Sequence, residues 1–375
     1  MRNPLSLILL PTLKCNADCE YCFEQKTNDY LTLDQLSSLM CKVLDYMEEK
    51  DISASTIYWQ GGEIMTLPPQ WFESAFNIIR DAAKSRGRWV QHSLQSNMIG
   101  YSSKWNPIIS KMFGNSVGTS MDFPNRYRKL LNGSAADYDA LWAKNVGAAR
   151  QAGIEVTAIA VPNAETVKVG AERFYQHFVE QLGITDFQVN TPFPGGEPNE
   201  TKENLSLDID QLGQFYVDLA QIWLQHGYRN NVRIGPFDAL LDYFTEGAAC
   251  LPCIWRQNCA DEFICIDAKG AVAQCDCWVT SYPEYWFGNL FQADSLGELL
   301  QTSKARKRFQ ERPKQLMQQG ECIDCEYLAL CHGGCPVRTY TLRNTLTEKD
   351  PYCELYQTLF QHMEKGSRQI SSARH

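Results

Sequence analysis

The chain lacks the features that would point to a membrane or to a nucleic acid. Its 375 residues contain no run of about 18 apolar residues, so we expect no membrane-spanning helix. The formal net charge is −9, whereas binding to nucleic-acid phosphates needs a concentrated basic surface. The basic run at residues 304–312 is typical of a solvated helix face. Neither a nucleic acid nor a membrane is therefore an expected partner.

A signal for export is also missing. The apolar stretch from Leu5 to Leu10 is too short for the hydrophobic region of a secretory signal peptide. With 44% hydrophobic and 21% charged residues, the composition is that of an ordinary globular protein, and the length allows one large and one smaller domain. We therefore expect a cytoplasmic protein, in a compartment that keeps thiols reduced.

Cysteine, in contrast, is abundant. Of the 15 cysteines, three fall between Cys15 and Cys22, Cys41 stands alone, and eleven fall between Cys250 and Cys353. In a reducing compartment, closely spaced cysteines hold metal more often than they form disulfides. The sequence therefore predicts metal sites near both ends of the chain.

Before the second cysteine group, short apolar or β-branched runs alternate with segments of helical spacing. Repeated strand–helix units predict a parallel sheet with right-handed crossovers. Six units do not fill a closed eight-unit barrel, so we expect an α/β fold with a partial barrel or an open sheet. The composition changes near residue 245, which predicts one domain over residues 1–240 and another over residues 245–375. The expected strands are residues 5–10, 55–59, 90–95, 117–121, 154–161 and 186–190.

The first three cysteines have the spacing of an iron–sulfur ligand set. Cys15, Cys19 and Cys22 offer three thiolates within eight residues, in the loop after the first expected strand. A [4Fe–4S] cluster has four irons, so three thiolates leave one iron open to bind and reduce a substrate. A structural zinc ion, the alternative, would need a fourth ligand from elsewhere in the chain.

This CxxxCxxC pattern, with Tyr21 before the last cysteine, resembles the signature of the radical S-adenosylmethionine (SAM) superfamily. The resemblance extends to about residue 240 and implies a TIM-like partial (β/α)6 barrel. It also implies that the open iron chelates SAM and that one electron cleaves a carbon–sulfur bond of SAM. The resulting 5′-deoxyadenosyl radical would abstract hydrogen from a substrate. An electron donor such as flavodoxin or ferredoxin is then an expected partner.

Segments after the next expected strands resemble the SAM-binding motifs of the superfamily. Residues 61–63 resemble its GGE motif, with isoleucine next where relatives usually have proline. Residues 95–97 (Gln-Ser-Asn) resemble its QTN segment, and Ser120 with Asp122 resembles its S-x-D segment. Arg128 lies where relatives place an arginine on the SAM carboxylate, and a surface ion pair is the alternative. The resemblance thus implies a SAM site made of Tyr21, Gly61, Gly62, Glu63, Gln95, Asn97, Ser120, Asp122 and Arg128.

The late cysteines resemble those of the small SPASM domain, found in radical enzymes that modify peptides and proteins. That resemblance implies two auxiliary [4Fe–4S] clusters with four cysteine ligands each, hence three clusters in all. One ligand set would surround a hairpin-like segment at residues 266–270, where Cys277 could replace Cys275. Two zinc sites are the alternative for these thiolates. The implied ligands are Cys322, Cys325, Cys331 and Cys353 for one cluster, and Cys253, Cys259, Cys275 and Cys335 for the other.

Asp276 lies between two of these cysteines. In the anaerobic sulfatase maturases, which carry this domain, an Asp directly after the matching cysteine serves as a base. It takes a proton while a substrate Ser or Cys is oxidised to an aldehyde. The alternative is an ordinary hairpin carboxylate near the cluster. Burial near the clusters could shift the pKa of Asp276 to a value suited to a general base.

The resemblance implies an oxidoreductase whose partner is a peptide or protein substrate. Candidates are a ribosomally made precursor peptide, crosslinked at a side chain, and a sulfatase whose Ser or Cys becomes formylglycine. About four residues precede the first expected strand, where many peptide maturases carry a leader-binding wing. If the protein is a peptide maturase, we expect leader recognition elsewhere in the chain or through a partner protein. A zinc-binding interaction protein without catalysis is the alternative of another class.

Overall fold

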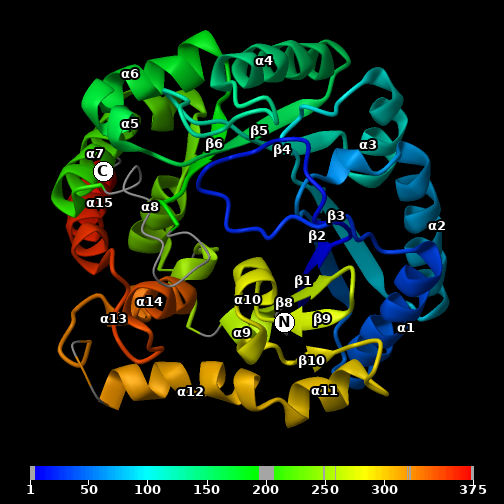
Figure 1. The fold of residues 1–375 in the computed structure, drawn as a ribbon. Helices are drawn as coiled ribbons and strands as arrows, with labels where there is room; N and C mark the ends of the chain where they lie inside the picture. The colour runs from blue at the N-terminus through cyan, green and yellow to red at the C-terminus, as the bar shows by residue number, and fades with distance from the viewer. Residues whose placement is uncertain are drawn as a thin grey trace. The chain divides into compact units, whose positions relative to one another are not determined.

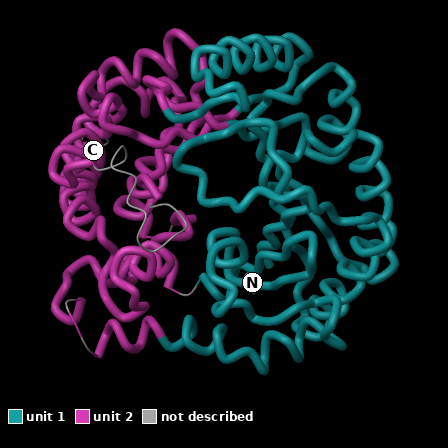
Figure 2. Tube along the Cα trace, in the orientation of Figure 1, with its two compact units in different colours: residues 1–119, 127–156, 258–311 teal, residues 120–126, 157–257, 312–375 magenta. Residues whose placement is uncertain are grey.

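The computed structural model describes residues 5–193, 207–247, 250–257, 259–318, 320 and 322–372 (Figure 1). The four residues on which the expectation about leader recognition rests lie outside these ranges. No helix within the ranges combines the length and the apolar character needed to cross a membrane. The chain forms two compact units, each assembled from segments far apart in the sequence (Figure 2). The first unit holds residues 1–119, 127–156 and 258–311, and the second holds residues 120–126, 157–257 and 312–375.

A six-stranded, mainly parallel sheet forms the core of the first unit. Its strands are β1 (Leu5–Leu10), β2 (Ala54–Trp59), β3 (Trp89–Leu94), β8 (Phe263–Asp267), β9 (Ala271–Ala273) and β10 (Gly288–Asn289). The strand order is β10–β9–β8–β1–β2–β3, and β8, β1, β2 and β3 run parallel. Because parallel strands end at one edge, the loops after β1, β2 and β3 and the turn after β8 share that edge.

Strand β1 is apolar at almost every position because it is an interior strand. Ile8 pairs with Tyr58 of β2 on one side and with Cys265 of β8 on the other. A further strand, β4 (Ser116–Ser120), lies mainly in this unit, and its Gly118 forms a bridge to Gln95 just after β3. The sheet therefore draws one of its parallel strands from the cysteine-rich part of the chain.

The helices of the first unit follow from capping residues and apolar spacing. The first of them begins after Thr32, which forms a capping box with Gln35. Its buried residues, among them Met40 and Met47, recur at helical spacing. The elements are α1 (Leu33–Glu49), η1 (Ile64–Thr66), α2 (Pro69–Ser85), η2 (Ser103–Trp105), α3 (Asn106–Met112), α4 (Ala135–Gln151), α9 (Cys259–Glu262), α10 (Asp276–Ser281), η8 (Pro283–Tyr285) and α11 (Leu296–Thr302), and α12 (Lys304–Gln318) continues into residues of the second unit.

The second unit contains three adjacent parallel strands and a set of helices. The strands are β5 (Glu155–Ala160, with its first two residues in the first unit), β6 (Asp186–Val189) and β7 (Arg233–Gly235). The long C-terminal helix of the unit packs against two of its other helices, α7 and α8. The helical elements are α5 (Ala164–Val169), α6 (Ala171–Tyr175), η3 (Gln176–Gln181), α7 (Ile209–Ile222), η5 (Trp223–Gly227), η6 (Tyr228–Asn230), α8 (Phe237–Glu246), η7 (Cys253–Trp255), α13 (Leu328–Cys331), α14 (Pro336–Arg343) and α15 (Cys353–Ser372).

The predicted α/β architecture with parallel strands is confirmed. The hairpin expected at residues 266–270 is also present, because β8 and β9 pair in antiparallel fashion and Gly270 N donates to Asp267 O over 3.1 Å. Two features were not predicted from the sequence: the short strand β7, and the parallel pairing of β8 with β1.

Candidate active site and cluster sites

The first three cysteines lie in the loop that follows β1, within the first unit. Asp18 N donates to Lys129 O over 2.7 Å, and Glu20 N donates to Tyr127 O over 2.9 Å, so a second segment holds this loop in place. Burial raises the pKa of Cys15 to about 12 and that of Cys22 to about 11, with the nearby Cys19 adding to both shifts. Three partly buried thiols on one short loop suit a cluster that stabilises thiolates, so the donor set fits.

The glycine pair after β2 lies against the chain that leads into this loop. A Cβ on Gly61 would meet Thr12 O at 2.5 Å, and a Cβ on Gly62 would meet Leu13 O at 2.4 Å. Gly61 also has a φ of +127°, which other residues rarely adopt. Only glycine therefore fits at this approach between the two loops.

Glu63, which follows the glycine pair, is a buried carboxylate with hydrogen bonds at both oxygens. Its Oε1 accepts from Met65 N at 2.8 Å and from Ser96 Oγ at 2.7 Å, and its Oε2 accepts from Asn97 N at 2.7 Å. Burial raises the pKa of Glu63, and these donors offset part of that shift. Glu63 thus ties the loop after β2 to the loop after β3.

The remaining predicted SAM ligands divide between the two units. In the first unit, Asn97 Nδ2 donates to Asn16 Oδ1 of the cysteine loop over 2.7 Å. The guanidinium of Arg128, itself mostly buried, lies 5.3 Å from the centre of the Tyr21 ring. The structure therefore brings Tyr21, residues 61–63, Gln95, Asn97 and Arg128 into the unit that holds the cysteine loop.

Ser120 and Asp122 belong to the second unit. Asp122 is buried, and its Oδ1 accepts from Val161 N at 2.9 Å, just after β5. This contact fixes the turn that follows β4 within that unit.

Asp276 is the first residue of α10, in the first unit. Its Oδ2 accepts from Gln60 Nε2 at 2.8 Å, and its Oδ1 accepts from Cys277 N at 2.9 Å. Burial raises the pKa of Asp276. Gln60 directly precedes the glycine pair, so the candidate base is joined to the same loop as the GGE segment. Apart from this position, no sequence pattern indicates a role for Gln60.

Glu24 is a second carboxylate of this region that sequence reasoning missed. Its Oε2 is buried, and no hydrogen-bond partner for it exists among the residues that the structure describes. Burial, followed by the negative charges of Asp276 and Asp267, raises the pKa of Glu24 well above its usual range. Its position two residues after Cys22 was visible in the sequence, but its burial was not.

The eight C-terminal ligand candidates also divide between the units. Cys259 and Cys275 lie in the first unit, whereas Cys253 and Cys335 lie in the second. The side-chain amide of Gln274 contacts Cys259 Sγ. The ligand atoms of Cys275, Asp276 and Cys277 lie within 4.8 Å of one another, so either cysteine offers a thiol at this place.

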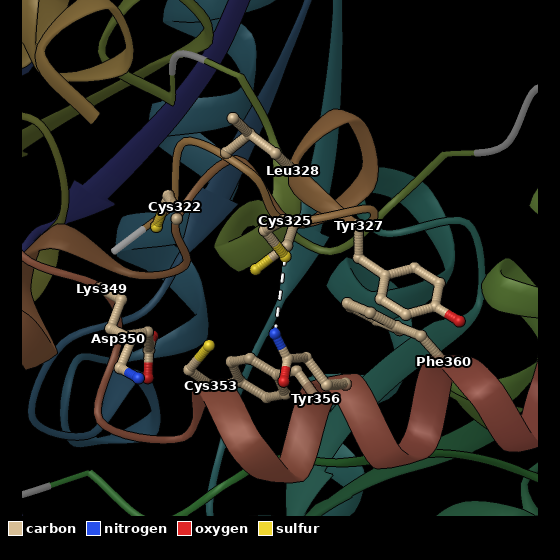
Figure 3. Close-up of a pocket in the computed structure, with 12 residues that line it drawn as sticks. Cys322, Cys325, Tyr327, Leu328, Lys349, Asp350, Cys353, Tyr356 and Phe360 are labelled. Atoms are coloured by element: carbon tan, nitrogen blue, oxygen red, sulfur yellow. Dashed lines mark hydrogen bonds between the residues drawn. The ribbon is translucent and has the colours of Figure 1, made fainter. Parts of the chain in front are cut away.

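The other four candidates line one pocket of the second unit (Figure 3). This pocket is lined by Cys322, Cys325, Cys331 and Cys353, together with Asp350, Tyr356 and Gln357. Burial raises the pKa of Cys353 to about 11 and raises that of Cys331 as well. Four converging thiols are a complete ligand set for a [4Fe–4S] cluster, so the residues present fit that group.

Buried charges hold the loops that carry these thiols. Arg312 donates to Leu346 O at 2.7 Å, to Gly333 O at 2.9 Å and to Gly334 O at 3.2 Å. Asp350 Oδ2 accepts from Cys335 N at 2.7 Å. The backbone of the loop between α13 and α14 is therefore held by hydrogen bonds to two buried charged side chains.

No protein-family model matches the chain. It is 25% identical to a cysteine-type anaerobic sulfatase-maturating enzyme of Clostridium perfringens (strain 13 / Type A), over 96% of each chain. It is 23% identical to the serine-type enzyme of Bacteroides thetaiotaomicron, over 96% of this chain and 90% of that one. The chain is similar to anaerobic sulfatase-maturating enzymes along almost its whole length.

Solved structures agree on the fold. Native anSMEcpe with bound AdoMet and the Cp18Cys peptide matches with a TM-score of 0.84 and 23% identity, over 99% of this chain and 100% of that one. Streptococcus suis SuiB bound to its precursor peptide SuiA matches with a TM-score of 0.60 and 15% identity, over 94% of this chain and 76% of that one. Together with the sequence relatives, these matches confirm the α/β fold, the resemblance to radical SAM enzymes and the prediction of an enzyme.

Proposed function

We propose that this protein is a radical SAM oxidoreductase that removes a hydrogen atom from a side chain of a peptide or protein and oxidises that side chain. The observation that carries the proposal is an arrangement within the first unit. The three-thiol loop after β1, the glycine pair after β2 and a carboxylate, Asp276, that is hydrogen-bonded to Gln60 all belong to it.

Cys15, Cys19 and Cys22 would hold the [4Fe–4S] cluster that, when bound, supplies the electron that cleaves SAM into the hydrogen-abstracting radical. Gly61 and Gly62 would let their backbone carbonyls approach the methionyl group of SAM. The buried Glu63 would keep that loop in place. The wider set of proposed SAM contacts is Tyr21, Gly61, Gly62, Glu63, Gln95, Asn97, Ser120, Asp122 and Arg128.

The proposed reaction is the oxidation of a Ser or Cys side chain, as in sulfatase maturation. Asp276 would take the proton of the substrate hydroxyl or thiol, and Gln60 would orient the carboxylate for that transfer. The long alignments with cysteine-type and serine-type sulfatase-maturating enzymes favour this reading. Modification of a ribosomally made precursor peptide, such as crosslinking, is the second candidate, supported by the match to SuiB with its precursor peptide.

Two auxiliary clusters complete the proposal and would serve as electron acceptors when bound. The pocket with four thiols supports one of them. The proposed ligands of the other are Cys253, Cys259, Cys335 and Cys275, with Cys277 as the alternative to the last. We further propose a SPASM domain at residues 245–375 after a catalytic domain at residues 1–240, a flavodoxin or ferredoxin as electron donor, and a place in the cytoplasm.

The test is anaerobic reconstitution followed by two assays. The loaded protein should contain about twelve irons, with matching sulfide, and should convert SAM to 5′-deoxyadenosine. A sulfatase-derived peptide with a Ser or Cys at the target position should lose the mass expected for aldehyde formation, and the same peptide with Ala should not. Cys15→Ala should abolish deoxyadenosine formation. Zinc without sulfide in the purified protein would refute the enzyme proposal in favour of a zinc-binding protein.

A further inference from the structure

A side-chain amide donates a hydrogen bond to one of the four thiols of the second unit's pocket. Gln357 Nε2 lies 3.5 Å from Cys325 Sγ, and the dashed line in Figure 3 marks this bond. Both residues line the pocket. The contact is therefore made at the place where a cluster ligand would bind iron.

The helix α15 explains why the amide lies there. It begins at Cys353, and Gln357 follows four residues later, so both side chains leave the helix on the same face. One helix face thus supplies a thiol ligand and a hydrogen-bond donor to the same pocket. Gln361, one further turn along, is exposed.

Other polar side chains around the pocket have partners of their own. Lys349 Nζ donates to Glu354 Oε1 over 2.9 Å. The hydroxyl of Tyr356 accepts from Arg338 Nη1 at 2.5 Å. These two hydrogen bonds go to other side chains, whereas the amide of Gln357 donates to a thiol.

The chemistry of a ligated thiolate fixes the direction of this bond. A cysteine bound to iron carries no proton and can only accept, so the amide must present its N–H to the sulfur. A one-electron reduction makes the cluster more negative, and a donor at a ligand sulfur stabilises that added charge. Hydrogen bonds to the sulfurs are among the factors that set the potential of iron–sulfur clusters.

We propose that Gln357 is a positioning residue that raises the reduction potential of the cluster held by Cys322, Cys325, Cys331 and Cys353. The inference rests on the proposed function, in which this cluster accepts an electron. Its consequence is that the cluster becomes a better acceptor than its four-thiolate ligand set alone would make it.

The experiment uses the full chain with its clusters reconstituted, titrated with dithionite and followed by electron paramagnetic resonance. Gln357→Met removes the donor at similar length and should leave iron and sulfide content unchanged. It should shift the midpoint potential of one cluster by about 59 mV to more negative values. For a one-electron reduction this corresponds to a change of about tenfold in the equilibrium constant. Gln357→Glu, of the same shape but without the donor, should shift it in the same direction and further.

The matched control is Gln361→Met, the same change at an exposed position one turn further along the same helix, which should leave all midpoint potentials unchanged. The reduced wild-type cluster should also show hyperfine coupling to an exchangeable proton that Gln357→Met loses. If wild type holds the cluster and both Gln357 variants keep the wild-type potential, the inference is wrong while the proposed function stands. If wild type holds no iron–sulfur cluster on these thiols, the proposed auxiliary cluster fails, and the inference fails with it.

Discussion

The glycine pair after β2 offers the sharpest test of the proposed SAM site. Replacing Gly62 by Ala would place a Cβ 2.4 Å from Leu13 O and 2.6 Å from Lys14 O, both backbone atoms. Ordinary contact needs about 3.5 Å, so the backbone next to Cys15 must move by about 1 Å. Gly62 N and Glu63 N also donate to this segment, to Thr12 O at 3.1 Å and to Lys14 O at 2.9 Å.

This overlap should lower the free energy of unfolding by about 1–3 kcal/mol, as for other insertions into tight packing. The same shift should weaken SAM binding and slow deoxyadenosine formation, because the displaced segment leads into the cysteine loop. Denaturant unfolding of the metal-free protein measures the first effect, and product formation by the reconstituted protein measures the second.

Gly147 supplies the control for this change. It lies in the middle of α4, where an added Cβ would meet nothing within 4 Å. Gly147→Ala should therefore raise the free energy of unfolding by up to about 1 kcal/mol and leave SAM cleavage unchanged. A Gly62→Ala protein that matches wild type in both stability and deoxyadenosine formation would refute the argument from close approach.

Asp276→Asn should stop peptide oxidation but spare SAM cleavage, measured by peptide mass and by deoxyadenosine; unchanged turnover would remove Asp276 as the base. Because burial raises its pKa, wild-type oxidation should decline on acidification at a higher pH than an ordinary aspartate would cause. Gln60→Leu removes the hydrogen bond to Asp276 and should slow oxidation about tenfold with SAM cleavage intact; equal loss of both would indicate a structural role. Burial lowers the pKa of His92 to about 4, so the unfolded chain binds more protons between about pH 6.5 and 4. The free energy of unfolding should fall by about 3 kcal/mol at most as the pH drops through that window, and His92→Gln should flatten this dependence.

Local features of the sequence predicted much of the site. The spacing of Cys15, Cys19 and Cys22 and the glycine pair are short-range patterns, and the structure keeps each on the loop expected for it. The thiols of Cys322, Cys325, Cys331 and Cys353 were also predicted together, and they line one pocket. The sequence can place such residues near one another because short spacings along the chain keep them close in space; their role as ligands stays a prediction.

The features that were missed depend on pairing between distant segments. Nothing in residues 263–267 indicates that they add a parallel strand beside β1, because an apolar run of that length fits many partners. The hydrogen bond between Gln60 and Asp276 spans 216 positions in the chain, and it follows from that pairing. The burial of Glu24 Oε2, for which the described residues offer no hydrogen-bond partner, is likewise a property of the folded surroundings and not of the local sequence.

The place of β8 beside β1 has a consequence for how the protein is made. The N-terminal strand keeps one backbone edge unpaired until the ribosome has released residue 267, since β8 is the neighbour that covers that edge. The three-thiol loop directly follows this same strand. A fragment that ends near residue 240 would therefore expose an apolar, aggregation-prone strand edge directly before its cysteines. Cluster loading of the nascent chain should therefore come late, after the cysteine-rich part has emerged and folded back.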